Sequence, residues 1–189
     1  MSAPAIRKAV YEDLFTIPEH HVGQILHGTL HSHPRPAMPH AQASSELGSD
    51  LNQRFGRGRG GPGGWIILDE PELHLGADIL VPDLAGWRRA RMPEVPRNAF
   101  LKLAPDWVCE VLSPSTAKLD RGPKREVYAR ENVAHLWFVD PEARTLEVLS
   151  LDGATYRLIH TFSDDALVRA EPFDEVELEL GWLWGMRST

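Results

Sequence analysis

Two short apolar segments with a helical segment between them constrain the fold most. Residues 107–112 (WVCEVL) and 135–140 (HLWFVD) are nearly continuous apolar runs, which is typical of strands buried on both faces of a sheet. Between them, strong helix formers predict a helix over about 120–132 that starts near Gly122, since Pro123 is tolerable only in the first turn. The order strand, helix, strand predicts an α/β fold.

Further segments extend this core. The Asp152-Gly153 turn predicts a hairpin after the second strand, and WIILDE at 65–70 predicts another strand. Residues 40–55 place Ala43, Leu47, Leu51 and Phe55 four apart, which predicts a helix with one apolar face. We also expect a short, lid-like helix over 10–17 and a hairpin around Gly28. Within 73–87 we expect two short strands, with breaks at Gly76 and Pro82. We predict a mixed sheet flanked by helices.

Length and composition bound the class of protein. The 189 residues suffice for one domain with a substantial core, and we expect a single domain over 1–189. No apolar run approaches the roughly 18 residues of a membrane span, and the first residues lack the apolar stretch of a secretory signal. A single cysteine, Cys109, fits a reducing compartment and excludes a cysteine-rich zinc module. The expected location is the cytoplasm, with no membrane partner.

The charged residues are unevenly distributed along the chain. A net charge of -7 argues against a general nucleic-acid coat protein, because such binding depends on Lys and Arg. Arginines nevertheless dominate residues 54–61 and 86–102, whereas acids dominate 163–180. These blocks predict either a local basic face or solvated loops. The segment GRGRGGPGG at 56–64 is typical of flexible loops that touch nucleic acid.

Two acids stand out because they lie in or beside apolar strands. Asp83 follows Pro82 in VPDLAGW, and Glu110 lies inside DWVCEVL, where an uncompensated charge is costly. If the two carboxylates meet, they repel each other unless a cation lies between them, and Mg²⁺ or Mn²⁺ prefers oxygen ligands. The alternative is that Asp83 caps a turn and Glu110 pairs with an arginine.

A longer pattern connects these acids to a known family. Pro82-Asp83, Glu110 on its apolar strand, SPST at 113–116 and the D-x-x-x-K spacing of Asp120 and Lys124 follow one another. With matching segments over most of the chain, this pattern resembles the Uma-two family of bacterial endonucleases, within the PD-(D/E)XK nuclease superfamily. The resemblance implies a restriction-endonuclease-like fold and Mg²⁺- or Mn²⁺-dependent hydrolysis of phosphodiester bonds, with DNA as the expected partner and Asp83 and Glu110 as metal-binding acids.

The present sequence lacks a lysine at the position usual for this superfamily. In the superfamily the lysine stands two residues after the second acid, and this chain has Leu112 there. We expect Lys124 to replace it, because a helix that follows a strand can turn back over the carboxyl end of that strand. There Lys124 would orient a water and offset charge in the transition state. The alternative is that Lys124 is a surface lysine.

Five further residues are candidates for the site or its surroundings. Glu46 is a candidate third metal ligand, since the superfamily often supplies an acid from its first core helix, although Asp50 is equally placed and a solvated glutamate is the ordinary case. The others are His40 as a helix cap or substrate contact, Ser113 as a phosphate contact or part of an N-cap, and Asp120 and Tyr128 as residues that share the helical face of Lys124.

The sequence is also compatible with two other functions. Leu112 and the acidic total charge favour a catalytically degenerate nuclease-fold module that binds DNA or acts as a scaffold. His27, His31 and His33 would share one face of an extended strand, which raises a zinc hydrolase as a third hypothesis. The apolar segment LELGWLWGM at 178–186 is expected to pack on the domain or on a second copy in a homodimer.

Overall fold

The computed structural model describes residues 7–35 and 37–186. The first six residues, for which we expect no secretory signal, lie outside this range. The helical elements are η1 (Tyr11–Thr16), α1 (Met38–Leu51), η2 (Asn52–Gly56), α2 (Ala117–Leu119), η3 (Asp120–Lys124), α3 (Arg125–Arg130) and η4 (Leu180–Trp184). The strands are β1 (His21–Leu26), β2 (Thr29–Pro34), β3 (Trp65–Asp69), β4 (Leu73–Leu75), β5 (Asp78–Leu80), β6 (Leu84–Arg88), β7 (Trp107–Val111), β8 (His135–Asp140), β9 (Thr145–Asp152), β10 (Thr155–Ser163), β11 (Leu167–Val168) and β12 (Leu178–Glu179).

A six-stranded mixed sheet forms the centre of the fold. Its strand order is β10-β9-β8-β7-β6-β3, and β7 and β8 pair in parallel while the other neighbours are antiparallel. Every residue of β7 is buried. The parallel pair is joined by the helical stretch α2–η3–α3, so the predicted strand-helix-strand unit and the mixed α/β sheet are confirmed.

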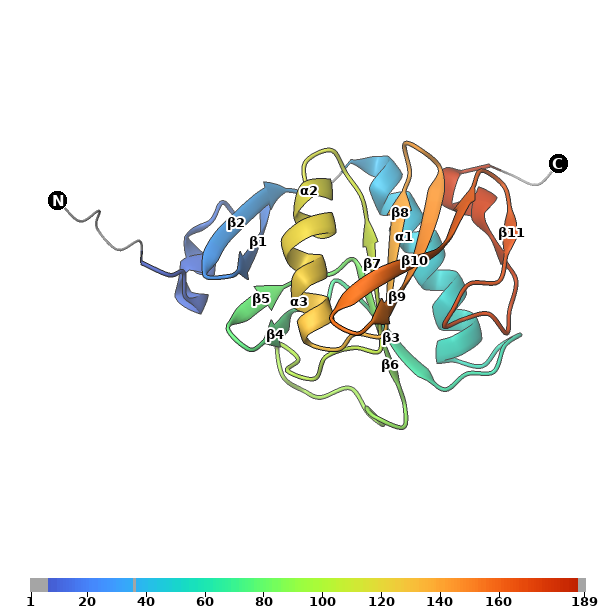
Figure 1. Ribbon diagram of the computed structural model, residues 1–189, viewed down its shortest axis with the longest axis horizontal. Coiled ribbons are helices and arrows are strands. Elements are labelled where there is room, and N and C mark those ends of the chain that lie inside the picture. The colour runs from blue at the N-terminus through green and yellow to red at the C-terminus, as the bar shows by residue number, and fades with distance from the viewer. Residues whose placement is uncertain (1–6, 36, 187–189) are drawn as a thin grey trace.

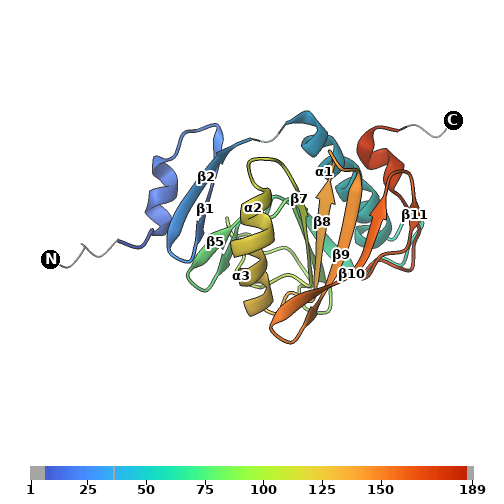
Figure 2. The same ribbon diagram turned by 45° about the horizontal axis from the view of Figure 1, so that its top comes forward.

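Helices cover both faces of this sheet. Figures 1 and 2 show α1 on one side and α2 with α3 on the other. Leu47, Leu51 and Phe55 pack in one core cluster with Trp107 and Cys109, which confirms the apolar face predicted for this helix. Gly48 permits the close approach, because a Cβ there would lie 3.0 Å from a methyl group of Leu84.

A second, four-stranded sheet was not predicted. Its order is β2-β1-β5-β4, and the chain leaves it after β5 to enter β6 of the central sheet. The breaks expected at Gly76 and Pro82 are confirmed, but residues 73–88 form three strands, because the residues after Pro82 pair with β3 and β7 instead of β5. Side chains from both sheets share one core cluster, which supports the single domain that remains a prediction.

The second helix differs from the prediction in where it begins. Helical structure starts at Ala117, so Pro123 lies inside the helix and not in its first turn. The turn that contains it, η3, is a π-helix, and the wider i→i+5 spacing interrupts the ordinary hydrogen-bond ladder at the place where proline has no N–H to donate.

The hairpin around Gly28 is confirmed, with consequences for the histidines. His27 and Gly28 form the turn between β1 and β2 with φ values of 52° and 77°. Only His31 and His33 lie on β2. The expectation that three histidines share one strand face is therefore wrong.

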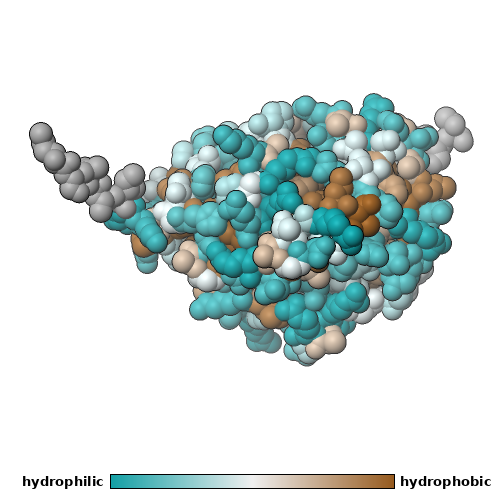
Figure 3. All heavy atoms as spheres, in the orientation of Figure 1, coloured by the Kyte–Doolittle hydropathy of each residue, from teal (hydrophilic) through white to brown (hydrophobic). Residues whose placement is uncertain are grey.

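The C-terminal segment packs on the domain. Leu178, Leu180 and Leu183 are buried in the core cluster beneath α1, while the Trp182 side chain is 45% exposed. Figure 3 shows a largely hydrophilic face with separate small hydrophobic areas. No helix within the described ranges is both long and apolar enough to cross a membrane.

Candidate active site

The two acids singled out in the sequence meet at one end of the central sheet. Leu84 of β6 lies opposite Cys109 of β7, so Asp83 and Glu110 stand at the ends of neighbouring strands. Both line one small cavity. The strand pairing therefore brings together two carboxylates that are 27 positions apart in the chain.

Glu110 is held by two side chains from the helix that follows its strand. Its Oε2 accepts a hydrogen bond from Lys124 Nζ at 2.6 Å, and its Oε1 accepts one from the Tyr128 hydroxyl at 2.5 Å. All three residues are at most 2% exposed. The predicted placement of Lys124 over the strand is confirmed, and the alternative of a surface lysine is wrong.

Lys124 makes two further contacts within the site. Its Nζ donates a hydrogen bond to the Val81 carbonyl at 3.1 Å and lies 3.3 Å from Asp120 Oδ1. Asp120, Lys124 and Tyr128 are spaced four apart, so the helix presents them on one face, as expected. Leu112, at the usual lysine position, is instead buried in the apolar core.

Asp83 is oriented from two directions. The Val111 N–H donates to its Oδ2 at 2.7 Å, and His40 Nε2 lies 3.1 Å from its Oδ1. His40 belongs to α1, which lies on the opposite face of the sheet from α2 and α3 (Figure 1). Asp83 thus connects the end of its strand to β7 and to α1, which is more than the turn cap considered as an alternative.

Burial and like charge dominate the electrostatics of the site. Burial raises the pKa of Glu110 to about 8, the charges of Asp120 and Asp83 add to this rise, and Lys124 opposes it. Burial also raises the pKa of Asp120. For Lys124, burial lowers the pKa, but the carboxylates of Glu110, Asp120 and Asp83 outweigh burial and raise it. Additional positive charge in the cavity would therefore favour the ionised forms of Glu110 and Asp120 over their protonated forms.

His40 has a similar balance. Burial by itself lowers the pKa of its imidazole, but the hydrogen bond to Asp83 and the negative charge of that carboxylate raise it. The contact with Asp83 therefore stabilises the protonated imidazole by more than burial destabilises it.

The donor atoms fit a hard divalent cation. The cavity has a volume of about 30 Å³, room for a water-sized group, and its lining includes Asp83, Glu110 and Asp120. In residues 7–35 and 37–186, no three His, Cys, Asp or Glu side chains are arranged to hold one ion. Zinc usually takes at least three protein ligands, whereas Mg²⁺ commonly binds through one or two carboxylates and keeps several waters. Two acids therefore suit Mg²⁺ or Mn²⁺ and do not support the zinc alternative.

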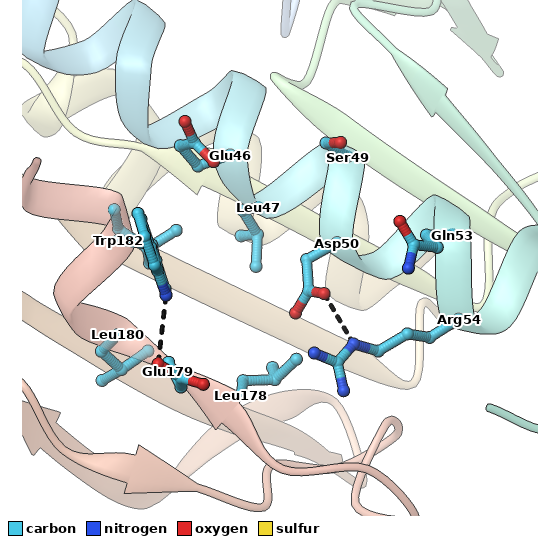
Figure 4. A pocket seen from close by; sticks show the side chains of 11 residues that line it. Glu46, Leu47, Ser49, Asp50, Gln53, Arg54, Leu178, Glu179, Leu180 and Trp182 are labelled. Atoms are coloured by element: carbon cyan, nitrogen blue, oxygen red, sulfur yellow. Dashed lines mark hydrogen bonds and ion pairs between the residues drawn. The ribbon is translucent and has the colours of Figure 1, made fainter. Parts of the chain in front are cut away.

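Two sequence candidates lie elsewhere. Glu46 is exposed on α1 and lines a different groove of about 320 Å³, where Trp182 and the Asp50–Arg54 ion pair also lie (Figure 4). This position does not support the metal role predicted for Glu46 or the alternative for Asp50. Ser113 is hydrogen-bonded to Thr116 Oγ1 at 3.0 Å, and its carbonyl accepts the Ala117 N–H, so it organises the start of the helix.

Four polar residues that line this cavity were not assigned to it from the sequence: Gln24, His33, Glu70 and Thr116. Gln24 of β1 is buried, and its Oε1 accepts a hydrogen bond from the Val81 N–H at 3.0 Å. A buried amide between apolar residues in VGQIL was a detectable signal. His33 was considered only as one of three zinc-binding histidines, and its approach to the cavity depends on the second sheet. Glu70 carried no sequence signal, and the pairing of β3 with β6 places it beside Asp83, whose carbonyl accepts the Glu70 N–H at 3.0 Å.

Comparisons with known proteins bear on the family and the fold of this chain. Residues 11–181 match the Uma2 family, described as "Putative restriction endonuclease". A similar solved structure is described as a "putative nuclease belonging to DUF820 from Anabaena variabilis", with 22% identity over 94% of this chain and 98% of that one, and a TM-score of 0.75. That likeness confirms the fold class. Among curated proteins, none matches this sequence.

Proposed function

Because this chain belongs to the Uma2 family, we propose that it is a divalent-metal-dependent endonuclease that hydrolyses phosphodiester bonds of DNA. Family and fold point to a restriction-endonuclease-like nuclease. The observation that carries the finer proposal is the cavity in which Lys124 lies 2.6 Å from Glu110 and Asp83 lines the same space. Two acids that could hold a metal ion and one amine beside them suit this hydrolysis.

Each group has a distinct role in the proposed reaction. Asp83 and Glu110 would hold Mg²⁺ or Mn²⁺. When bound, such an ion activates a water and offsets charge on the phosphate. Lys124 carries an ammonium that orients the attacking water by hydrogen bonding and stabilises the negative charge that develops on the phosphate oxygens.

The neighbouring residues position these three. Tyr128 donates to Glu110 and leaves each carboxylate oxygen with a free lone pair for a cation. Asp120 lies beside Lys124 and stabilises its ammonium. His40 fixes the orientation of Asp83, in the way that outer hydrogen-bond partners orient metal ligands. We propose no metal role for Glu46.

The position of Lys124 favours an enzyme over a degenerate module. Leu112 motivated the degenerate hypothesis, since it removes the lysine from the strand. An amine supplied by the helix restores the same charge beside the same acid. The single cysteine, Cys109, is buried and free, which suits the reducing cytoplasm where we place the reaction.

Nicking of supercoiled plasmid DNA tests this function. We would titrate Mg²⁺ and Mn²⁺ into the wild-type protein and into Asp83→Asn and Glu110→Gln, with Asp152→Asn as a control for removal of one exposed carboxylate. The expected result is nicking by the wild type and the control, and a loss of about 100-fold or more in the two site variants. Equal nicking by all four proteins would overturn the assignment. A wild type that binds metal and DNA without cleaving would make this chain a degenerate module.

A further inference from the structure

A polar groove lies between α1–η2 and β3 and is separate from the cavity of the acids. Its volume is about 330 Å³. The helical side supplies short hydroxyl and amide side chains and ends at an arginine, in the order Ser45, Ser49, Asn52, Gln53 and Arg57. We call it the α1–β3 groove. Hydroxyl, amide and guanidinium groups are those that contact phosphate and sugar in nucleic-acid complexes.

One end of this groove lies beside the acids. Ser44 lines the groove and is one helical turn from His40, which contacts Asp83. Across the groove, the Ser44 hydroxyl donates to Asp69 Oδ1 at 3.5 Å. Burial raises the pKa of Asp69, and the charge of Asp83 adds to that rise, in agreement with their closeness. A chain lying in the groove would therefore reach the proposed site of cleavage.

The other end of the groove leads to an exposed loop rich in arginine. Arg57 lines the groove, and the following loop, residues 57–64, folds back on η2. The Arg59 N–H donates to the Gln53 carbonyl at 2.9 Å, and the Gly63 N–H donates to the Arg54 carbonyl at 3.1 Å. The loop expected to be flexible is thus held in place by backbone hydrogen bonds.

The second basic block of the sequence meets this loop. The Arg89 N–H donates to the Gly64 carbonyl at 2.9 Å, and Arg88 lies over the Trp65 ring at 4.5 Å. We call the four exposed arginines on these two segments the arginine cluster: Arg57, Arg59, Arg88 and Arg89. Within the part of the chain that the structure describes, the nearby Arg54 and Arg91 form ion pairs with acids, and the four cluster members form none.

We propose that the α1–β3 groove and the arginine cluster bind the sugar-phosphate backbone of the DNA strand that flanks the scissile bond. This inference rests on the proposed function, since it places the substrate of that same site. From Ser44 to Asn52 the helix rises about 12 Å, which corresponds to three or four nucleotides of one strand in B-form DNA. The acids would then cut at one end of the strand segment while the arginines hold the other.

The composition of this surface also predicts how DNA is recognised. Contacts to phosphate and sugar fix the position of a strand but carry no direct sequence information. Binding through arginine releases counterions, so affinity falls steeply with salt. The negative total charge limits attraction elsewhere on the molecule. We therefore expect salt-dependent binding with little preference for base sequence.

Fluorescence anisotropy with a short labelled DNA duplex tests the proposal. Binding is measured over a salt series with a chelator present, so that cleavage does not interfere. The cluster variant is Arg57→Ala with Arg59→Ala. The matched control is Arg144→Ala with Arg157→Ala, which removes the same charge from the β8–β9 turn and from β10, the edge strand opposite β3. A third protein, Arg57→Lys with Arg59→Lys, keeps the charge.

We expect the cluster variant to bind at least about 10-fold more weakly, while the control matches the wild type and the lysine variant recovers part of the affinity. In a plot of the logarithm of the binding constant against the logarithm of the salt concentration, the slope for the cluster variant should be smaller in magnitude by about 0.9 for each phosphate that the protein no longer neutralises. Equal affinities of the cluster variant and control would overturn the inference and leave the proposed function standing. A wild-type protein that does not bind the duplex would instead remove DNA as the substrate and the groove proposal with it.

Discussion

Lys124 places its ammonium 2.6 Å from the carboxylate of Glu110, although the two residues are 14 positions apart and come from a helical segment and a strand. The contact is fully buried, and Asp120 and the Val81 carbonyl hold the same ammonium. A helix has supplied the amine that the related motif takes from the strand. Lys124 is the last residue of the π-turn η3.

Removal of this amine should separate catalysis from metal binding. Lys124→Ala is expected to lower the cleavage rate by about 100- to 1,000-fold, since it removes one preorganised charge from the transition state. Metal affinity, measured by calorimetry, should stay equal or rise, because a positive charge beside the acids has been removed. The free energy of unfolding should fall by about 3 kcal/mol, because Glu110 loses its charge partner.

The exposed Lys118 on α2 offers a matched control. Lys118→Ala should leave both the cleavage rate and the free energy of unfolding close to wild type. If Lys124→Ala instead cleaved plasmid at the wild-type rate, Lys124 would have a structural role only.

Tyr128 is expected to act through Glu110. Tyr128→Phe removes the hydrogen bond to Oε1 and should lower the free energy of unfolding by about 1–2 kcal/mol. The loss also favours the protonated form of Glu110, so the rising limb of the pH–rate profile should move to higher pH. Tyr156→Phe is the control, because the Tyr156 hydroxyl lies outside the site and donates a hydrogen bond to the Val133 carbonyl at 2.6 Å. It should cost similar stability without a shift of the profile, and identical profiles for both variants would contradict the role of Tyr128.

Periodic patterns explain what the sequence could predict. Ala43, Leu47, Leu51 and Phe55 are all buried, because a spacing of four keeps side chains on one helical face. The same spacing places Asp120, Lys124 and Tyr128 together. Both are local properties of one helix, so neither depends on knowing the tertiary structure.

Contacts between distant short elements were beyond such patterns. β4 and β5 have three residues each, too few to reveal an alternation of apolar and polar side chains. They belong to the same sheet as β1, the strand that brings Gln24 to the cavity. Glu46 shows a different limit. At about 100° per residue, it lies on the opposite side of the apolar stripe from Ser44, so proximity in sequence to Leu47 did not bring it near the acids.

Two residues of α1 test this correction. His40→Ala should lower metal affinity and the cleavage rate by about 10- to 100-fold, because Asp83 loses a hydrogen-bond partner that orients it. Glu46→Ala should remain within about twofold of wild type in both measurements. Calorimetry with Mn²⁺ and plasmid nicking measure the two quantities. A severe loss in Glu46→Ala with an intact His40→Ala would reverse the assignment.

The half-buried His135 at the start of β8 predicts a pH dependence of stability that is independent of the acids. Burial lowers the pKa of its imidazole below the usual value of 6.5, and among the residues that the structure describes none forms a hydrogen bond with its buried Nδ1. The folded protein therefore takes up this proton less readily than the unfolded chain. As the pH falls through 6.5 toward the lowered pKa, protonation favours the unfolded state, and stability decreases.

Above about pH 7.5 the imidazole is neutral in both states, so His135 contributes no slope there. His135→Gln removes the titration, and the free energy of unfolding, measured by urea denaturation between about pH 5 and 8, should fall less steeply with acid than in the wild type. The difference in slope should stay below about 1.4 kcal/mol per pH unit, the limit for a single proton. His160→Gln, which alters an exposed histidine on β10, is the control substitution. Parallel curves for His135→Gln and the wild type would show that this imidazole titrates alike in both states.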